Sequence, residues 1–224
     1  MQGSGILFSE MTPPDHSRDE FHEWYDTHHI PVRMAVPGFL SARRYRAAES
    51  SPTSYLAVYE MTDLKAIQSD AYGVVKNQPS DQTRRMLAAV SGFTRYLGSE
   101  MSVRRKPDAG QAALDAPVLY AVWFTVPVGR LEDFDAWYET DHVPILMESP
   151  DWLMVRRFKI TDGQPHAHNR LALHYLADHR AMSSEARERA RNTPWRAKIS
   201  SEPWFRGSYT VFDAHRPRQT GQVA

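Results

Sequence analysis

One block of sequence occurs twice in this chain. Residues 21–45 read FHEWYDTHHIPVRMAVPGFLSARRY, and residues 134–158 read FDAWYETDHVPILMESPDWLMVRRF. A single offset of 113 residues, without a gap, aligns the aromatic, histidine, proline and paired arginine positions of the two copies. A repeat at about half of the chain length indicates an internal duplication in which each copy is one folding unit.

Length assigns each copy to its own domain of about a hundred residues. The chain has 224 residues, and the segment RRKPDAGQAALDAP between the copies is polar and contains several Ala, Pro and Gly residues. We expect a first domain over residues 1–105, a linker over 106–117, a second domain over 118–213 and a disordered tail over 214–224.

Charge balance and the missing cysteines exclude several classes of protein. Lys plus Arg equals Asp plus Glu at 27 each, so no net charge favours nucleic acid or an anionic membrane surface. The chain has no cysteine, which excludes disulfides, thiolate catalysis and cysteine-bound metal. No apolar run reaches the roughly 18 residues of a membrane span. We therefore expect a cytoplasmic protein with a small-molecule substrate, no nucleic-acid or membrane partner, and pairing into a homodimer.

Each copy begins with a short strand, and a helix carrying the repeated block follows it. The strands are expected at Ile6–Thr12 and Leu119–Thr125, before Pro13 and Pro127. Aromatic residues recur at helical spacing in the block, which predicts a buried stripe. Pro31 and Pro144 are expected to end the two helices. His29 and His142 would then lie on the last turn, where the negative helix end raises the basicity of an imidazole.

Three further strands and a second helix complete each copy. Strands are expected at Leu40–Arg46, Ser54–Met61 and Thr94–Val103, and at Leu153–Ile160, Arg170–Leu176 and Ser208–Phe212, with second helices from Asp63 and Asp178. The predicted fold class is α+β, with two tandem ferredoxin-like β-α-β-β-α-β units. Pairing of their open sheet faces would form an intramolecular dimeric α+β barrel.

The repeated block resembles the EthD-like branch of the dimeric α+β barrel superfamily. The matching residues are Trp24, His29, Pro31, Pro37-Gly38 and Phe39. The resemblance implies a pocket between sheet and helices within a half, lined by the helix-end histidine and by aromatic residues. It covers both halves, and the relatives include isomerases, polyketide cyclases, monooxygenases, haem enzymes and hydrolases. Asp151 departs from the glycine that the family favours, so the two pockets need not be equivalent.

Histidines and tyrosines of the block are the candidate catalytic residues. His29 or His142 could act as a general base, and Tyr25 or Tyr138 could polarise a carbonyl or enolate. The alternative for each histidine is that it caps its own helix. His28 is a further candidate, because a His28 and Asp141 pair across the halves would be an oriented base.

Arginines, tryptophans and one strand histidine are the candidate substrate-binding residues. Strand alternation puts Arg43 and Arg156 on a face with aromatic residues, where either could anchor a carboxylate. Arg44 and Arg157 point the other way and could bridge to the other half, although a register slip would exchange these roles. Trp24 and Trp137 could stack on a flat substrate, with core packing as the alternative. His174 could reach the second cavity or be a core histidine.

Two other patterns point to no site. His166 and His168 alternate in a loop, but no carboxylate falls at a ligand spacing, so we expect no metal. The basic segment EARERARNTPWRAK has acids among its arginines and is expected to be a solvated helix face.

These residues predict a cofactor-independent enzyme for a small planar anionic substrate, such as a lactone or unsaturated ester acid from aromatic catabolism. His-mediated isomerisation or hydrolysis is the first expectation. A polyketide cyclase or cofactor-free monooxygenase is the second, and a non-catalytic ligand-binding or accessory protein is the third.

Overall fold

The computed structural model describes residues 2–221, and these form two compact units. Unit 1 contains the described residues up to Ser99, Thr161–Pro165 and those from Ala214 onward. Unit 2 contains Glu100–Ile160 and His166–Asp213. These bounds differ from the expected domains in the segments 100–117, 161–165 and 214–221. The first of these includes the expected linker 106–117, which belongs to unit 2.

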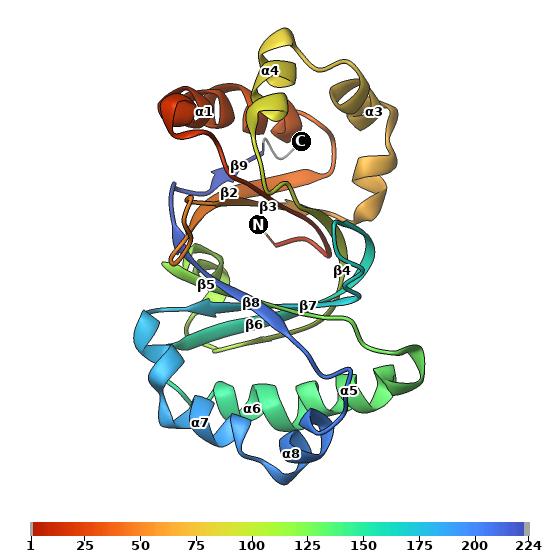
Figure 1. Cartoon of the computed structure of the whole chain (residues 1–224), viewed down its shortest axis with the longest axis vertical. Helices are drawn as coiled ribbons and strands as arrows, with labels where there is room; N and C mark the ends of the chain where they lie inside the picture. The colour runs from red at the N-terminus through yellow and green to blue at the C-terminus, as the bar shows by residue number, and fades with distance from the viewer. Residues whose placement is uncertain (1, 222–224) are drawn as a thin grey trace. The chain divides into compact units, whose positions relative to one another are not determined.

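Unit 1 has the expected element order, with helices that cover one face of an antiparallel sheet (Figure 1). Its strands pair in the order β4-β1-β3-β2. The elements are β1 (Gly5–Met11), α1 (Arg18–Trp24), a π-helical turn η2 (Tyr25–His29), α2 (Ile30–Met34), β2 (Phe39–Ala47), β3 (Tyr55–Met61), α3 (Asp70–Asn77), α4 (Asp81–Ala89) and β4 (Arg95–Arg105).

Unit 2 repeats that order, and its helices α5 to α8 also lie on one face of the sheet (Figure 1). Its strands pair in the order β6-β7-β5-β8, again antiparallel. The elements are β5 (Val118–Phe124), α5 (Leu131–Trp137), a π-helical turn η6 (Tyr138–His142), α6 (Val143–Leu146), β6 (Trp152–Gln164), β7 (Arg170–Leu176), α7 (Glu185–Arg191), α8 (Pro194–Ser200) and β8 (Ser208–Ala214).

Side-chain caps fix where the later helices begin, and they recur at matching places in the two units. Ser69 accepts a hydrogen bond from the Tyr72 amide at the start of α3, as Ser184 does from the Arg187 amide at the start of α7. Such a cap satisfies a backbone donor that the helix itself leaves free. Tyr72 and Arg187 are therefore equivalent positions. Each lies in the first turn of its helix and lines a cavity of its own unit.

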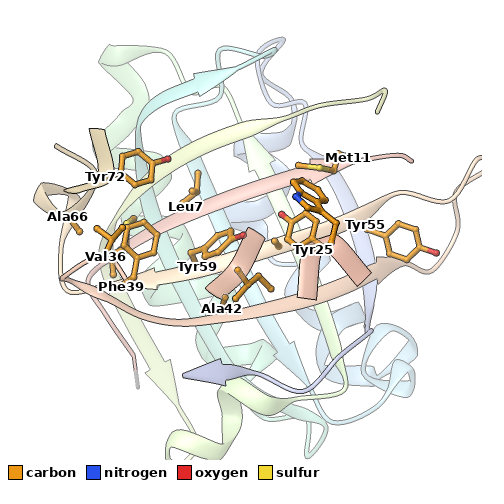
Figure 2. Packing of buried hydrophobic residues seen from close by; sticks show 14 of the residues in the cluster. Leu7, Met11, Tyr25, Val36, Phe39, Ala42, Tyr55, Tyr59, Ala66 and Tyr72 are labelled. Atoms are coloured by element: carbon orange, nitrogen blue, oxygen red, sulfur yellow. The ribbon is translucent and has the colours of Figure 1, made fainter. Parts of the chain in front are cut away.

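The core of each unit lies between its sheet and its helices. Figure 2 shows this core in unit 1, where side chains from β1, β2 and β3 lie beside Tyr25 of the π turn. Phe21, Trp24 and Tyr25 are buried there, as Phe134, Trp137 and Tyr138 are in unit 2. The expected aromatic stripe is thus a core face in both units.

The prolines of the repeated block do not end their helices, which corrects the expectation for Pro31 and Pro144. Each helix passes through a π turn and continues as α2 or α6. In that turn the Ile30 amide bonds the Tyr25 carbonyl, and the Val143 amide bonds the Tyr138 carbonyl. A proline clashes with the carbonyl four residues before it in a regular α-helix, and the wider turn relieves that clash.

The expected linker and tail are partly ordered. Within residues 106–117, Gly110–Asp115 forms a 3-10 helix whose Ala113 and Leu114 are buried. From residue 214 the chain is expected to be disordered, but Gln219 and Thr220 form a short strand, β9, paired with β2. Arg216 pairs with Asp26 at 3.1 Å. The remainder of the expected tail, residues 222–224, lies outside the described residues.

Candidate functional site

Unit 2 contains a cavity of about 470 Å³ between its sheet and its helices. We call it the chamber. Tyr120, Trp152 and His174 line it from the sheet, and Tyr138 and His142 line it from the π turn. The structure therefore brings together four of the sequence-predicted site residues, Trp137, Tyr138, His142 and His174, in one hollow that is mostly aromatic.

Three side chains at the floor of the chamber form a buried hydrogen-bond chain. The Trp152 Nε1–H donates to His174 Nδ1 at 3.1 Å, and His174 Nε2 lies 3.0 Å from the Tyr138 hydroxyl. Tryptophan can only donate, so Nδ1 is an acceptor and Nε2 carries the proton of a neutral ring. His174 Nε2–H then donates to the Tyr138 oxygen, which leaves the Tyr138 proton available to another acceptor.

Burial keeps this chain uncharged. His174 is fully buried, and burial lowers its pKa well below the usual 6.5. Burial also raises the pKa of Tyr138, although the Arg157 guanidinium works against that rise. Tyr138 is therefore a neutral hydrogen-bond donor at physiological pH. His174 is a satisfied core histidine and at the same time part of the chamber wall.

His142 has a fixed tautomer as well. Its Nδ1 lies 3.2 Å from the Ala190 carbonyl, which can only accept, so Nδ1 carries the proton and Nε2 has the lone pair. Burial lowers the pKa of His142 to about 4. The expectation that a helix end raises its basicity is therefore wrong, because desolvation of the charged ring outweighs the helix dipole. A neutral imidazole with a free lone pair is the form that accepts a proton.

The π turn places the aromatic and histidine side chains next to each other. The rings of Trp137 and His142 are 4.8 Å apart between centroids, and those of Tyr138 and His142 are 5.1 Å apart. Residues five positions apart face different sides of an α-helix with about 3.6 residues per turn. The wider turn closes i to i+5 hydrogen bonds and brings them together, a feature that often marks functional sites.

Four arginines surround the chamber. They are Arg187 and Arg191 on α7, Arg196 on α8, and Arg206 before β8. Among the described residues, no carboxylate lies within ion-pair distance of any of the four. The Arg196 guanidinium lies over the Phe205 ring at 4.3 Å and over the Trp137 ring at 5.7 Å. These cations create a positive potential that suits an anionic ligand.

The arginines predicted to anchor a substrate lie elsewhere, which corrects the expectation. Arg156 is fully buried and pairs with Glu100 at 2.8 Å, and Arg43 is buried beside Tyr45. Neither lines the chamber.

Arg44 and Arg157 lie on the helix side of their sheets, and their ion pairs stay within one unit. Arg157 pairs with Asp135 and Glu139, and its guanidinium lies 4.6 Å from the Tyr138 ring centroid. Arg44 pairs with Asp26 and lies 4.4 Å from the Tyr25 ring centroid. The alternation on the strand is as expected, but neither pair of arginines has the role expected for it.

Unit 1 has only a small counterpart of the chamber, of about 80 Å³. Tyr59 on β3 takes the place of His174, because it pairs with Leu7 as His174 pairs with Tyr120. Tyr72 and Arg33 fill the space, with the Arg33 guanidinium 5.8 Å from the Tyr59 ring. Such a volume holds about two or three waters and no aromatic substrate.

The candidate residues of unit 1 are consequently core residues. His29 is 4% exposed, and burial lowers its pKa well below 6.5. Its Nδ1 is buried without a hydrogen-bond partner in residues 2–221. Figure 2 shows Tyr25 beside Tyr59 over the sheet. Trp24 donates to the Thr83 hydroxyl at 3.3 Å, as a packed core tryptophan does.

His28 and Asp141 each have a partner in their own unit. His28 Nε2 lies 3.1 Å from the Ser80 hydroxyl, and the Thr193 hydroxyl donates to Asp141 at 2.6 Å. Ser80 and Thr193 cap α4 and α8, so the two positions hold the start of a helix. That role is structural, and the oriented base suggested for this pair is not needed to account for either residue.

His166 and His168 have rings 5.4 Å apart, and His168 stacks on Trp123. Within residues 2–221, no group of three or more metal-binding side chains is assembled. In the same part of the chain, no helix is both long enough and apolar enough to cross a membrane.

Several chamber residues were not among the candidates. Tyr120 and Trp152 look like ordinary strand residues in the sequence, and only the cross-strand register brings them to His174. Arg187 and Arg191 belong to the segment expected to be a solvated face. Their spacing of four residues was a usable signal, because it places both guanidiniums on one side of α7.

Solved structures show which fold this is. An anthrone oxidase-like protein matches 98% of this chain and 94% of its own length, with a TM-score of 0.68 and 9% identity. A candidate monooxygenase from Fusobacterium nucleatum matches 96% of this chain and 94% of its own, with a TM-score of 0.59 and 11% identity. A mutant chlorite dismutase from Candidatus Nitrospira defluvii matches 95% and 93%, with a TM-score of 0.55 and 7% identity.

These neighbours are dimeric α+β barrel, ferredoxin-like proteins, and the chain shares their α+β fold. Identities this low establish the fold alone. No protein-family model matches the sequence, and no curated protein is similar to it in sequence.

Proposed function

We propose that the protein is a cofactor-independent enzyme that removes a proton from a planar, acidic substrate in the chamber of unit 2. His142 is the general base and Tyr138 is the donor to the oxyanion that forms. The observation that carries this proposal is the pair of fixed tautomers. His142 has a lone pair at Nε2 that can accept a proton. His174 donates a hydrogen bond to the Tyr138 oxygen, so the Tyr138 hydroxyl can donate its own proton to an oxyanion.

The low basicity of His142 selects the kind of substrate. An imidazole with a pKa of about 4 is neutral at physiological pH and always able to accept a proton, but it is a weak base. Moving a proton to it from an acid with a pKa of roughly 10 costs about 8 kcal/mol. Tyr138 and the four arginines stabilise the resulting anion and offset that cost. An acidic hydroxyarene or a related activated carbon acid fits this site better than a weakly acidic aliphatic C–H group.

Two reactions by proton transfer are compatible with these groups. Return of the proton to another carbon of the anion gives isomerisation. In hydrolysis, His142 takes the proton from a water molecule that attacks an ester or lactone carbonyl, and the bond from the acyl carbon to the leaving oxygen breaks as that oxygen receives the proton. The second candidate is reaction of the carbanion with dioxygen, favoured by the chamber's aromatic walls and by the anthrone oxidase-like neighbour. In that reaction a CH₂ group becomes a carbonyl; one oxygen atom enters the product, and the other leaves as water with the two hydrogens.

We also propose that the two units arose by tandem duplication within the EthD-like branch. The gap-free offset, the matching π turns and the matching strand orders support this history. Copy two keeps an open chamber, whereas Tyr72 and Arg33 have closed the equivalent space in copy one.

The test is a panel of planar carbon acids, anthrone among them, incubated with the protein in air and under argon. Product mass distinguishes the fates, because isomerisation leaves the mass unchanged, hydrolysis adds water, and oxidation replaces two hydrogens by one oxygen. We expect His142→Gln to abolish turnover and His29→Gln, if it folds, to retain it. Full turnover by a folded His142→Gln protein would remove the proposed base.

A further inference from the structure

A second hollow adjoins the chamber on the outside of unit 2. This groove has a volume of about 650 Å³ and lies along α7 and α8. Arg187, Arg191, Arg196 and Ser200 line the groove and the chamber alike. The two hollows therefore adjoin each other, and the arginines stand at the junction.

The hollows differ sharply in chemistry. The chamber is walled by the rings of Tyr120, Tyr138 and Trp152, whereas serines, Asn192 and arginines line the groove. A flat apolar ring is favoured in the chamber, where it displaces water from aromatic surface. A charged group is favoured in the groove, where it stays hydrated and meets hydrogen-bond donors.

The charge at the junction is not compensated by the protein. Arg187, Arg191 and Arg196 have no carboxylate partner among residues 2–221, and Glu188 is the one acid in the lining of the groove. Arg187 instead donates to the Met182 carbonyl at 2.7 Å, which holds its guanidinium in place. Three guanidiniums held together without a counterion repel one another, and an anion between them relieves that repulsion.

We infer that the substrate is amphipathic, with its reacting ring in the chamber and a dianionic group, a phosphate ester or a pair of carboxylates, in the groove against Arg187, Arg191 and Arg196. This inference rests on the proposed function for the identity of the reacting end. A guanidinium can bind two oxygens of one phosphate or carboxylate at once, so three of them match a dianion better than a single charge. The groove would thus select the substrate by its tail, and the chamber would do the chemistry.

Binding of model compounds tests this without any turnover. The probes are 1-naphthol, 1-naphthyl phosphate, naphthalene-1,2-dicarboxylate and inorganic phosphate, titrated calorimetrically into the full chain at low and high salt. We expect one or both naphthyl dianions to bind at least about tenfold more tightly than 1-naphthol, with a preference that salt reduces. The comparison of phosphate with dicarboxylate shows which dianion the groove prefers.

Two variants of the same helix provide the matched comparison. Arg191 and Arg189 are both exposed on α7, but Arg191 lines the groove, whereas Arg189 pairs with Glu148 outside it. We expect Arg191→Gln to weaken the preferred dianion about tenfold without affecting 1-naphthol, and Arg189→Gln to leave both unchanged. A circular dichroism melt checks that both variants fold.

Three results would overturn the inference. They are equal affinity for 1-naphthol and both dianions, equal losses in the two arginine variants, and binding of inorganic phosphate as tight as that of naphthyl phosphate. The binding result is independent of the test of the proposed function, because His142→Gln removes the proposed base and leaves the three arginines of the groove in place. Loss of the base hypothesis with retained dianion binding would leave the groove assignment standing.

Discussion

Replacement of His142 by glutamine should make the stability of the protein less sensitive to acid. In the folded protein the pKa of His142 falls from 6.5 to about 4, because the charged ring cannot be hydrated in the wall of the chamber. Below about pH 6.5 the unfolded chain binds a proton that the folded chain does not bind, so this group costs stability as the pH falls. Above pH 6.5 the ring is neutral in both states, and this loss of stability is absent.

The size of the effect follows from the width of that window. Each pH unit within it changes the free energy of unfolding by about 1.4 kcal/mol for one proton. Between about pH 7 and pH 5, the wild type should therefore lose about 2 kcal/mol more than His142→Gln. The loss of packing in the variant is the same at every pH, so the difference between the two pH values isolates the titration.

Urea unfolding followed by tryptophan fluorescence at several pH values measures this difference. His16→Gln is the control, because His16 is an exposed histidine of unit 1, and its removal should leave the wild-type slope unchanged. The two units can unfold in separate steps, so the transition that reports unit 2 is the one to compare. A variant curve parallel to the wild type would show that His142 titrates alike in both states, and the neutral base would then lose its physical support.

Three further predictions concern the buried groups. Tyr138→Phe should lower kcat about 100- to 1000-fold on a substrate found by the panel. Its loss of stability should be only about 1 kcal/mol, because one hydrogen bond is removed. Similar turnover by wild type and variant would exclude Tyr138 as the oxyanion donor. Arg157→Met should cost about 3 to 5 kcal/mol in urea unfolding because it leaves Glu139 and Asp135 with fewer partners, whereas Arg189→Met should cost less than about 1 kcal/mol. Burial raises the pKa of Glu10 to about 7, so the folded chain holds its proton above the usual 4.5 and wild-type stability falls as the pH rises through that window. The free energy of unfolding of Glu10→Gln, measured by urea unfolding, should thus rise relative to that of the wild type between pH 5 and pH 8. A difference between the two proteins that stays constant with pH would contradict this.

Local sequence was sufficient to predict the four strands and the first helix of each unit, but not the division of the second helical segment into α3 and α4 or into α7 and α8. An apolar run located β7 to the residue, and the aromatic spacing located the buried face of α1 and α5. These features depend on residues a few positions apart, whose relation is set by the backbone period. The prolines were misread because the rule for a regular helix does not allow for the wider turn that accommodates them.

Tertiary contacts decided which half of the protein contains the chamber. His29 and His142 hold equivalent places in the repeat, yet one faces a filled core and the other an open chamber. The difference comes from residues far away in the sequence, because Tyr72 fills space in unit 1 where Arg187 borders the chamber in unit 2. Their pKa values were likewise predicted in the wrong direction, since burial depends on the whole surroundings of a ring and not on its helix position.

Repeat spacing and side-chain period act locally, so the residue pattern alone predicts two like α+β units, each with an imidazole beside aromatic rings. Contacts between distant residues establish which imidazole borders a cavity, which tyrosine has a proton to donate, and which arginines lack a counterion. Those properties arise from atoms that meet across the sheet and between helices, as Trp152, His174 and Tyr138 do. The separation of such residues along the chain does not predict that they are in contact.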